Sequence, residues 1–182
     1  MDRALHTGYL VREMKDDDLE IVLSWRNQDE VRRYMYTRHR IGMEEHRRWF
    51  ERTSRDNDSK LLILEYQATP IGFINFRKSS HNTEEAEWGF YLAPNAPRGA
   101  GGALGEKALE YAFTTLKLNK VLGEVLAYNE RSIRFHLRMG FQKEKIFSQK
   151  YFDGCHYHDV IIFTISEHDW MSSHYENHEH TK

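Results

Sequence analysis

The sequence has a single cysteine, Cys155, three prolines, and no apolar run near the roughly 20 residues that a helix needs to cross a bilayer. One cysteine excludes an intramolecular disulfide, and the first residues, Met-Asp-Arg-Ala-Leu-His, lack the apolar core of a signal peptide. The 26 basic and 28 acidic residues give a net charge of −2, so no global field favours nucleic acid or an anionic membrane. We therefore predict a cytoplasmic protein with no nucleic-acid or membrane partner, in which any anion site is local.

The length of 182 residues suits one domain that can bury a core without disulfide or metal support. We predict a single domain over residues 1–172. Residues 173–182, Ser-His-Tyr-Glu-Asn-His-Glu-His-Thr-Lys, have little to bury and are predicted to form a flexible, histidine-rich tail. No repeat or linker indicates a second domain.

Hydrophobic periodicity predicts an α/β chain. The order of strand, helix and strand over residues 83–127 predicts a parallel crossover, whereas turns at residues 68–70 and at Asp153-Gly154 predict hairpins. The aspartates of residues 16–18 are expected to begin a helix. Strands are predicted at residues 8–14, 61–66, 71–77, 83–92, 121–127, 142–152 and 157–165, and helices from residue 19 and at 27–36, 43–52, 106–117 and 129–141.

A glycine cluster after two prolines, in residues 93–109, joins a strand to a helix. Free backbone N–H groups and the helix dipole make such a junction an anion site. A Walker-type loop needs a Gly-Lys-Ser/Thr end, which this segment lacks. A dinucleotide fingerprint needs a third glycine, where the chain has Leu104, and a closing acidic residue, where it has Asn129. The loop predicts a phosphate cradle of another kind.

The segment from Arg98 to Ala103 resembles the acetyl-CoA pyrophosphate loop of the GNAT superfamily of N-acetyltransferases. Asn-x-x-Ser-Ile-x-Phe-x-x-x-x-Gly-Phe, from Asn129 to Phe141, is similar to the second cofactor motif of that family and follows at its spacing. The resemblance implies a GNAT fold of the α/β (α+β) class, with one mixed, largely antiparallel sheet flanked by helices and a splayed parallel pair that forms the acetyl-CoA cleft. It implies acetyl-CoA as cosubstrate and no metal. The cofactor-binding residues that it implies are Phe90, Tyr91, Leu92, Arg98, Gly99, Ala100, Gly101, Gly102, Ala103, Asn129, Ser132, Phe135, His136 and Arg138.

The N-terminal third looks like the start of the PseH-type enzymes of this superfamily, which acetylate the 4-amino group of a UDP-linked amino-dideoxy sugar on the route to pseudaminic acid, a flagellin-modifying sugar. Cationic side chains suit such a diphosphate. A plain core role for the aromatic residues, and a solvated arginine with a half-buried histidine, are left open. The residues that carry this resemblance are Trp25-Arg26-Asn27, Val31-Arg32, Met35, Ile41, His46 and Trp49-Phe50, and the acceptor-binding residues that it implies are Arg26, Asn27, Met35, Tyr36, His46 and Phe50.

Glu87 is the predicted base for the acceptor amine, because it lies on the strand just before the acetyl end of the cofactor. Alternation places it on the face of Gly89 and Tyr91. A merely exposed carboxylate is the alternative, with Glu84 or Glu85 acting through a water.

His136 stands where the family usually has a tyrosine, five residues before Phe141. An imidazole can protonate a leaving thiolate, although it is only partly charged at neutral pH. We predict His136 as this acid, with Tyr91 and Tyr128 as rival donors.

Cys155, His156 and His158 raise the question of a metal site. Alternation turns the cysteine away from the two histidines, and no second ligand pair completes a tetrahedral set. Two other functions stay open, a protein N-terminal acetyltransferase of the ribosomal-protein type and a non-catalytic acyl-CoA-binding module. The predicted partner is a small-molecule nucleotide sugar, and a homodimer is left open.

Overall fold

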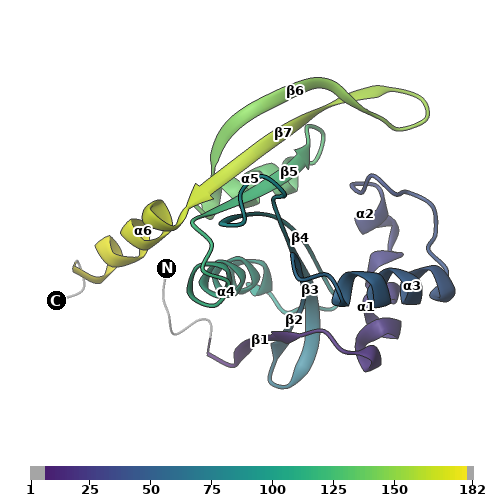
Figure 1. Cartoon of the computed structure of the whole chain (residues 1–182), viewed down its shortest axis with the longest axis horizontal. Helices are drawn as coiled ribbons and strands as arrows, with labels where there is room; N and C mark the ends of the chain where they lie inside the picture. Colours follow the sequence, from purple (N-terminus) through teal and green to yellow (C-terminus); the bar gives the residue numbers. More distant parts are fainter. Residues whose placement is uncertain (1–6, 180–182) are drawn as a thin grey trace. The chain divides into compact units, whose positions relative to one another are not determined.

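The computed structural model describes residues 7–179, in which seven strands form one mixed sheet (Figure 1). The hydrogen-bonded strand order is β1-β2-β3-β4-β5-β7-β6. β4 and β5 run parallel, whereas β1 with β2, β2 with β3, β5 with β7 and β6 with β7 run antiparallel. The predicted mixed, largely antiparallel sheet with one parallel pair is therefore confirmed. The strands are β1 (Tyr9–Glu13), β2 (Ser59–Tyr66), β3 (Thr69–Lys78), β4 (Glu85–Leu92), β5 (Lys120–Leu126), β6 (Gln142–Phe152) and β7 (Tyr157–Ser166).

The helices of the described residues follow the predicted order. No helix in residues 7–179 has both the length and the apolarity to cross a bilayer. The helices are the 3-10 helix η2 (Asp16–Asp18), α1 (Leu19–Arg26), α2 (Asp29–Arg32), α3 (Met43–Ser54), α4 (Ala100–Thr114), α5 (Glu130–Arg138) and α6 (Glu167–Glu179).

The described chain divides into two compact units. We call Gly8–Arg77 with Gly89–Ala108 the N-terminal unit, and Lys78–Trp88 with residues 109–179 the C-terminal unit. β4 and α4 each contribute residues to both units. The single domain expected from the chain length stays a prediction.

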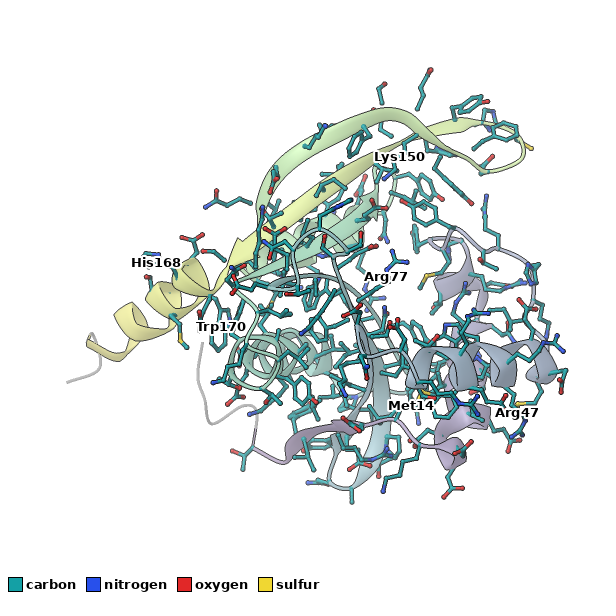
Figure 2. All side chains as sticks on the ribbon, in the orientation of Figure 1. Met14, Arg47, Arg77, Lys150, His168 and Trp170 are labelled. Carbon is teal, nitrogen blue, oxygen red and sulfur yellow. The ribbon has the colours of Figure 1, made fainter. Side chains whose placement is uncertain are left out.

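The core of the N-terminal unit lies where α1 and α3 pack on β2 and β3. Trp25 and Phe50 are both buried there, as the core interpretation of these aromatic residues expects, and Trp49 packs at the edge. Burying large apolar side chains of this kind contributes about 1.5–3 kcal/mol each. The cluster comprises Met14, Leu19, Val22, Trp25, Phe50, Leu61, Ile63, Phe73 and Ala93, and Figure 2 labels Met14.

The β2–β3 hairpin turns at Gln67 and Ala68, whose φ angles are +50° and +62°. Two positive φ angles are typical of the two-residue hairpin turns whose twist matches that of the strands. Thr69 and Pro70 already belong to β3, so the turn expected at residues 68–70 begins one residue earlier.

The acidic run begins a helix, as predicted, but Asp18 also forms a buried ion pair. Arg12 of β1 donates to both carboxylate oxygens of Asp18, at 2.6 and 2.8 Å, and to Glu65 at 2.7 Å. Burial acts to raise the pKa of Asp18, but the bonds and charge of Arg12, together with the backbone bond and charge of Lys15, outweigh it, so the pKa is lowered.

The second helix is shorter than predicted. The pattern indicated residues 27–36, whereas α2 covers Asp29–Arg32. After Arg33 the backbone bonds shift to the three-residue spacing, from Tyr34 to Val31 and from Met35 to Arg32, which ends an α-helix.

The C-terminal unit contains the parallel pairing of β4 with β5, followed by β7 and β6. β6 and β7 form the long hairpin drawn in light green and yellow in Figure 1. Lys150 of β6, labelled in Figure 2, pairs with Glu124 of β5 at 2.7 Å. The predicted hairpin turn is confirmed, with Gly154 at a φ of +100°.

Helix α6 covers part of the range in which we expected a tail. It continues through residues 173–179, and residues 180–182 lie outside the described residues. Near its start Trp170 packs on Phe113 of α4, with 5.5 Å between ring centroids.

Candidate active site

The glycine-rich loop ends in the first turn of α4. Gly99, with a φ of +91°, precedes the helix, and its carbonyl accepts the N–H groups of Gly102 and Ala103 at 3.0 and 3.2 Å. The N–H group of Ala100 bonds to Pro97 at 3.0 Å. Within residues 7–179, the N–H groups of Gly99 and Gly101 have no such backbone partner, so both are donors that an anion can use.

Gly101 leaves space that a pyrophosphate group requires. A Cβ built on it would meet only Leu92 Cδ1, at 4.0 Å, which is ordinary contact distance. The loop therefore fits the phosphates of CoA, because it combines a helix N-terminus, backbone donors and open space at Gly101.

β4 supplies the second part of the predicted cofactor site. Its ladder with β5 joins Glu85, Ala86 and Glu87 to residues 120–122, so Trp88–Leu92 lie beyond that ladder among the described residues. Backbone beyond the end of a ladder can pair with an extended ligand, and a pantetheine arm is one.

Tyr91 of β4 is packed within the N-terminal unit. Its ring stacks on Phe73 of β3, with 5.0 Å between the centroids. Burial raises the pKa of the Tyr91 phenol, and nearby Arg26 offsets part of this effect. The phenol is therefore protonated at neutral pH, and it is a weaker acid than an exposed tyrosine.

Glu87 is half-buried and pairs with Leu122 in the parallel ladder. Its neighbours Ala86 and Trp88 are buried, so Glu87 points to the opposite face of β4, as alternation predicts. The rival carboxylates each accept a hydrogen bond from an asparagine: Glu84 from Asn119 at 2.7 Å and Glu85 from Asn82 at 3.0 Å.

His136 does not have the environment that an acid for the thiolate needs. The side chain is 2 % exposed, Nε2 accepts a hydrogen bond from Trp88 Nε1 at 3.1 Å, and Nδ1 donates to the Ser132 carbonyl at 2.8 Å. Burial lowers the pKa of His136 to about 4. The imidazole is thus neutral at pH 7, and its one ring proton is already used, which corrects the predicted acid role.

The other α5 residues divide between capping and core positions. The Asn129 side chain accepts the N–H group of Ser132 at 3.1 Å and caps the helix, as its sequence position predicts. Phe135 is buried, with its ring 6.2 Å from that of Trp88. Arg138 is exposed at the end of the helix. The cofactor contacts implied for these residues stay predictions.

Tyr128, one of the rival acid candidates, lies in the C-terminal unit against the ring of His158, with 4.6 Å between the centroids. His158 in turn contacts the Asp153 carboxylate at 2.8 Å. That contact, and the backbone bonds from His156 and Cys155, lower the pKa of Asp153. Within residues 7–179, no group of three metal-ligating side chains is gathered.

The predicted acceptor residues lie in the N-terminal unit, around two arginines. Arg26 Nη2 donates to the Thr37 carbonyl at 2.8 Å, and Arg32 Nη1 lies 3.4 Å from the Arg38 carbonyl. Arg26 Nη1 and Arg32 Nε are buried and have no hydrogen-bond partner among the described residues.

The charge around Arg26 is mostly uncompensated. Burial lowers the pKa of the guanidinium and Arg32 lowers it further, whereas Tyr91 and Glu45 partly offset the shift. Arg32 is paired with Asp29 at the surface of α2. A buried guanidinium with an unused donor is expected to bind an anionic ligand.

Asn27 and His46, two of the predicted acceptor residues, make contacts within the N-terminal unit. The Asn27 amide bonds to both the N–H and the carbonyl of Ile41, each at 2.9 Å, so one of its two donors and one acceptor site are used. His46 is 3 % exposed and stacks on Trp49, with 5.0 Å between ring centroids, and its buried Nε2 has no hydrogen-bond partner among the described residues. Burial lowers its pKa, which a hydrogen bond to the Leu19 backbone partly offsets. The remaining acceptor candidates differ in burial: Met35 is half-buried, Tyr36 is 50 % exposed and Phe50 is core.

Two residues of the N-terminal unit lie outside the predicted set and bear on the proposals below. Arg32 carries part of the N-terminal resemblance but is not one of the acceptor residues that it implies, and its Nε is buried without a partner among the described residues. Asn75 is the other, and its signal was an amide in the middle of the apolar strand β3.

The sequence of the chain is similar to those of known acetyltransferases. The model of the acetyltransferase (GNAT) domain matches residues 9–142. The chain is 28% identical over 129 residues to the acetyltransferase PseH of Campylobacter jejuni strain 81-176, covering 71% of this chain and 80% of the relative. It is 22% identical over 165 residues to the spermidine N(1)-acetyltransferase of Escherichia coli K12, covering 90% and 89%.

The fold has solved counterparts. The spermidine N-acetyltransferase of Vibrio cholerae in complex with CoA and spermine superposes with a TM-score of 0.81 at 21% identity, covering 91% of this chain and 99% of the other. That likeness confirms the fold, and the family-model match extends over most of the N-terminal and central elements. The chain belongs to the GNAT family of acetyltransferases and is an acetyl-CoA-dependent N-acetyltransferase.

Proposed function

We propose that the enzyme acetylates a primary amine on an acceptor that carries a negative charge, with the 4-amino group of a UDP-linked amino-dideoxy sugar as the leading candidate. In one ternary complex the amine nitrogen forms a bond to the acetyl carbon and the carbon–sulfur bond breaks. The nitrogen loses one proton and the departing thiolate gains one, so no covalent enzyme intermediate is required.

The cofactor residues divide by the part of acetyl-CoA that they bind. The N–H groups of Gly99 and Gly101 and the side chain of Arg98 bind the pyrophosphate, and the Phe90–Leu92 backbone pairs with the pantetheine arm. A backbone N–H group near Tyr91 or Leu92 faces the thioester oxygen and stabilises the charge that develops there. The loop geometry supports the first of these roles.

The observation that carries the acceptor proposal is a pair of half-buried arginines. Arg26 and Arg32 each hold one nitrogen that is buried without a partner in the described residues. A diphosphate supplies several acceptor oxygens and two negative charges to such groups. A polyamine brings only positive charge, which two nearby arginines repel.

Proton transfer is assigned to the carboxylate of Glu87 and to a tyrosine. Glu87 accepts the proton of the amine, directly or through a water. Tyr91 is the preferred donor to the thiolate because the ring proton of His136 is engaged, although burial makes the Tyr91 phenol a weak acid by raising its pKa. A thiol has a pKa of about 8.5, so its thiolate leaves without full protonation and loss of the donor is expected to slow the reaction only modestly.

The positive charges of Arg26 and Arg32 also bear on the alternative acceptors. Spermidine acetyltransferases are among the relatives, and a ribosomal-protein tail is another candidate amine. Both acceptors are basic and would require an acidic groove, which the arginine pair disfavours. A non-catalytic acyl-CoA-binding role would leave acetyl-CoA bound and unconsumed. The homodimer stays a prediction, and analytical ultracentrifugation would test it by measuring the mass of the protein in solution.

The test compares thiol release with UDP-amino-dideoxy sugar and with spermidine for the wild type, Arg26→Gln and the control Arg48→Gln. Arg48 lies on α3 in an exposed pair with Glu44. We expect the wild type to prefer the sugar, and Arg26→Gln to raise the sugar KM by about tenfold or more while leaving that for acetyl-CoA unchanged. Equal kinetics in Arg26→Gln and wild type, or a preference for spermidine, would refute the proposed acceptor.

A further inference from the structure

Two residues that are unfavourable in strands lie against each other in the N-terminal unit. Asn75 is in the middle of β3 between the buried residues Ile74 and Phe76, and Gly89 is in the middle of β4. A Cβ built on Gly89 would lie 2.6 Å from Asn75 Oδ1, so the amide occupies the place of the missing side chain. Asparagine and glycine both weaken strands, and a strand glycine often marks a site where a ligand approaches.

This pair continues a series of cross-strand contacts between β3 and β4. Ile71 accepts the N–H group of Ala93 at 2.8 Å, and Phe73 stacks on Tyr91 at 5.0 Å. Asn75 and Gly89 come next, two residues further along each strand. The contact between β3 and β4 is thus apolar at Phe73 and Tyr91, and two residues further along it consists of the Asn75 amide packed on the backbone of Gly89.

The Asn75 amide has no structural task that explains it. It is half-buried, and no hydrogen bond joins it to another residue in the described part of the chain. The Asn75 amide is not among the side-chain atoms that are buried without a partner, so water reaches it, and an apolar pair like Phe73 with Tyr91 would stabilise the strands instead. Local choices that lower stability are expected at functional sites.

We propose that Asn75 binds the acceptor beside its reactive amine, and that Gly89 is glycine so that the amide can lie there. The inference rests on the proposed function, in which the backbone of Phe90–Leu92 holds the acetyl end of the cofactor. An amide offers one acceptor and two donors, which suit an uncharged amine together with a neighbouring hydroxyl. Asn75 thereby orients the nitrogen without adding a charge that would keep it protonated.

The test measures acceptor kinetics for Asn75→Ala, Gly89→Ala and the double variant, with Thr69→Ala at the exposed start of β3 as control. Each is run on both UDP-amino-dideoxy sugar and spermidine, and melting temperature and acetyl-CoA Kd are measured alongside. We expect Asn75→Ala to lower kcat/KM for the acceptor by about 10- to 100-fold, with Kd for acetyl-CoA within twofold of the wild type.

Gly89→Ala distinguishes acceptor binding from general packing. Its Cβ must displace the Asn75 amide, whose terminal oxygen can rotate away, so we expect a folded protein with the same kinetic defect. The double variant should lose no more than Asn75→Ala alone, because the amide is already gone. Additive losses, or wild-type acceptor kinetics in Asn75→Ala, would overturn the proposal.

The two acceptors separate this inference from the proposed function. If the wild type acetylates spermidine and not the sugar, the proposed acceptor is wrong. The kinetics of Asn75→Ala and of the wild type with spermidine then test the role of Asn75. If neither amine releases thiol from acetyl-CoA, both proposals are overturned.

Discussion

Replacing Gly101 by valine tests the cofactor loop, because the free protein can accommodate the change and the bound pyrophosphate cannot. The new Cβ would lie 4.0 Å from Leu92 Cδ1 and meets nothing nearer outside its own helix. Glycine is itself the poorest helix former after proline, so helix stability is not lowered. The side chain instead covers the N–H group of Gly101, which is one of the two donors free for an anion.

The size of the effect follows from the bond that is lost. A hydrogen bond to a charged group contributes about 1.5–3 kcal/mol, which corresponds to roughly 10- to 150-fold in Kd. Steric exclusion of the phosphate adds to this, so we expect Kd for acetyl-CoA to rise by about 100-fold or more. At a ligand concentration of 100 times the wild-type Kd, binding then stabilises the variant by about 0.4 kcal/mol, compared with about 2.7 kcal/mol for the wild type.

Calorimetric titration with acetyl-CoA and thermal melts with and without it measure both quantities. Gly42→Val is the matched control, because Gly42 precedes α3 and a Cβ there meets nothing within 4 Å. The control should keep the wild-type Kd. An unchanged Kd in Gly101→Val, with an unchanged melting temperature, would show that the pyrophosphate does not bind at this loop.

Three further predictions concern stability. Gly123→Ala should lower the free energy of unfolding by about 1–3 kcal/mol in urea titrations, since its Cβ would lie 2.4 Å from His136 Nε2; an unchanged midpoint would contradict this packing. The pKa of His136 lies at about 4 in the folded state against 6.5 unfolded, so the unfolded chain binds the extra proton between these values. Stability should therefore fall by about 3 kcal/mol more in the wild type than in His136→Gln as the pH drops from 6.5 to 4, and parallel curves would refute the shift. Arg12→Ala should cost about 3 kcal/mol by leaving Asp18 buried and unpaired, whereas Arg48→Ala, in an exposed pair, should cost under about 1 kcal/mol; equal costs would argue against a buried pair.

Periodicity and turn chemistry predicted the order of elements because both act over a few residues. The asparagine cap of α5 and the hairpin at Gly154 are set by local bonds, and both were found where expected. The predicted length of α2 was wrong, because the backbone bonds change to three-residue spacing after Arg33 and the chain then continues as a loop whose Thr37 and Arg38 carbonyls accept from Arg26 and Arg32. Such contacts depend on the folding of the loop and leave no periodic signal.

The role of His136 shows why the site was harder to predict than the fold. Its sequence position matches a family acid, but Trp88 of β4 and Gly123 of β5 enclose the ring. Burial and hydrogen bonding, which set the pKa, come from strands far away in the sequence. The same holds for Asn27, whose amide is used by Ile41 fourteen residues later. Residue type thus predicted the chemical groups at these positions, whereas the packing around them determines which of their hydrogen-bonding atoms can still bind a ligand.

Mass spectrometry of a UDP-linked 4-amino-dideoxy sugar, incubated with acetyl-CoA and the enzyme, tests the central claim most directly. We predict that the sugar gains the mass of one acetyl group and that one equivalent of CoA thiol is released. Spermidine in the same reaction should compete poorly. An unmodified sugar, together with acetylated spermidine or with no released thiol, would contradict the account.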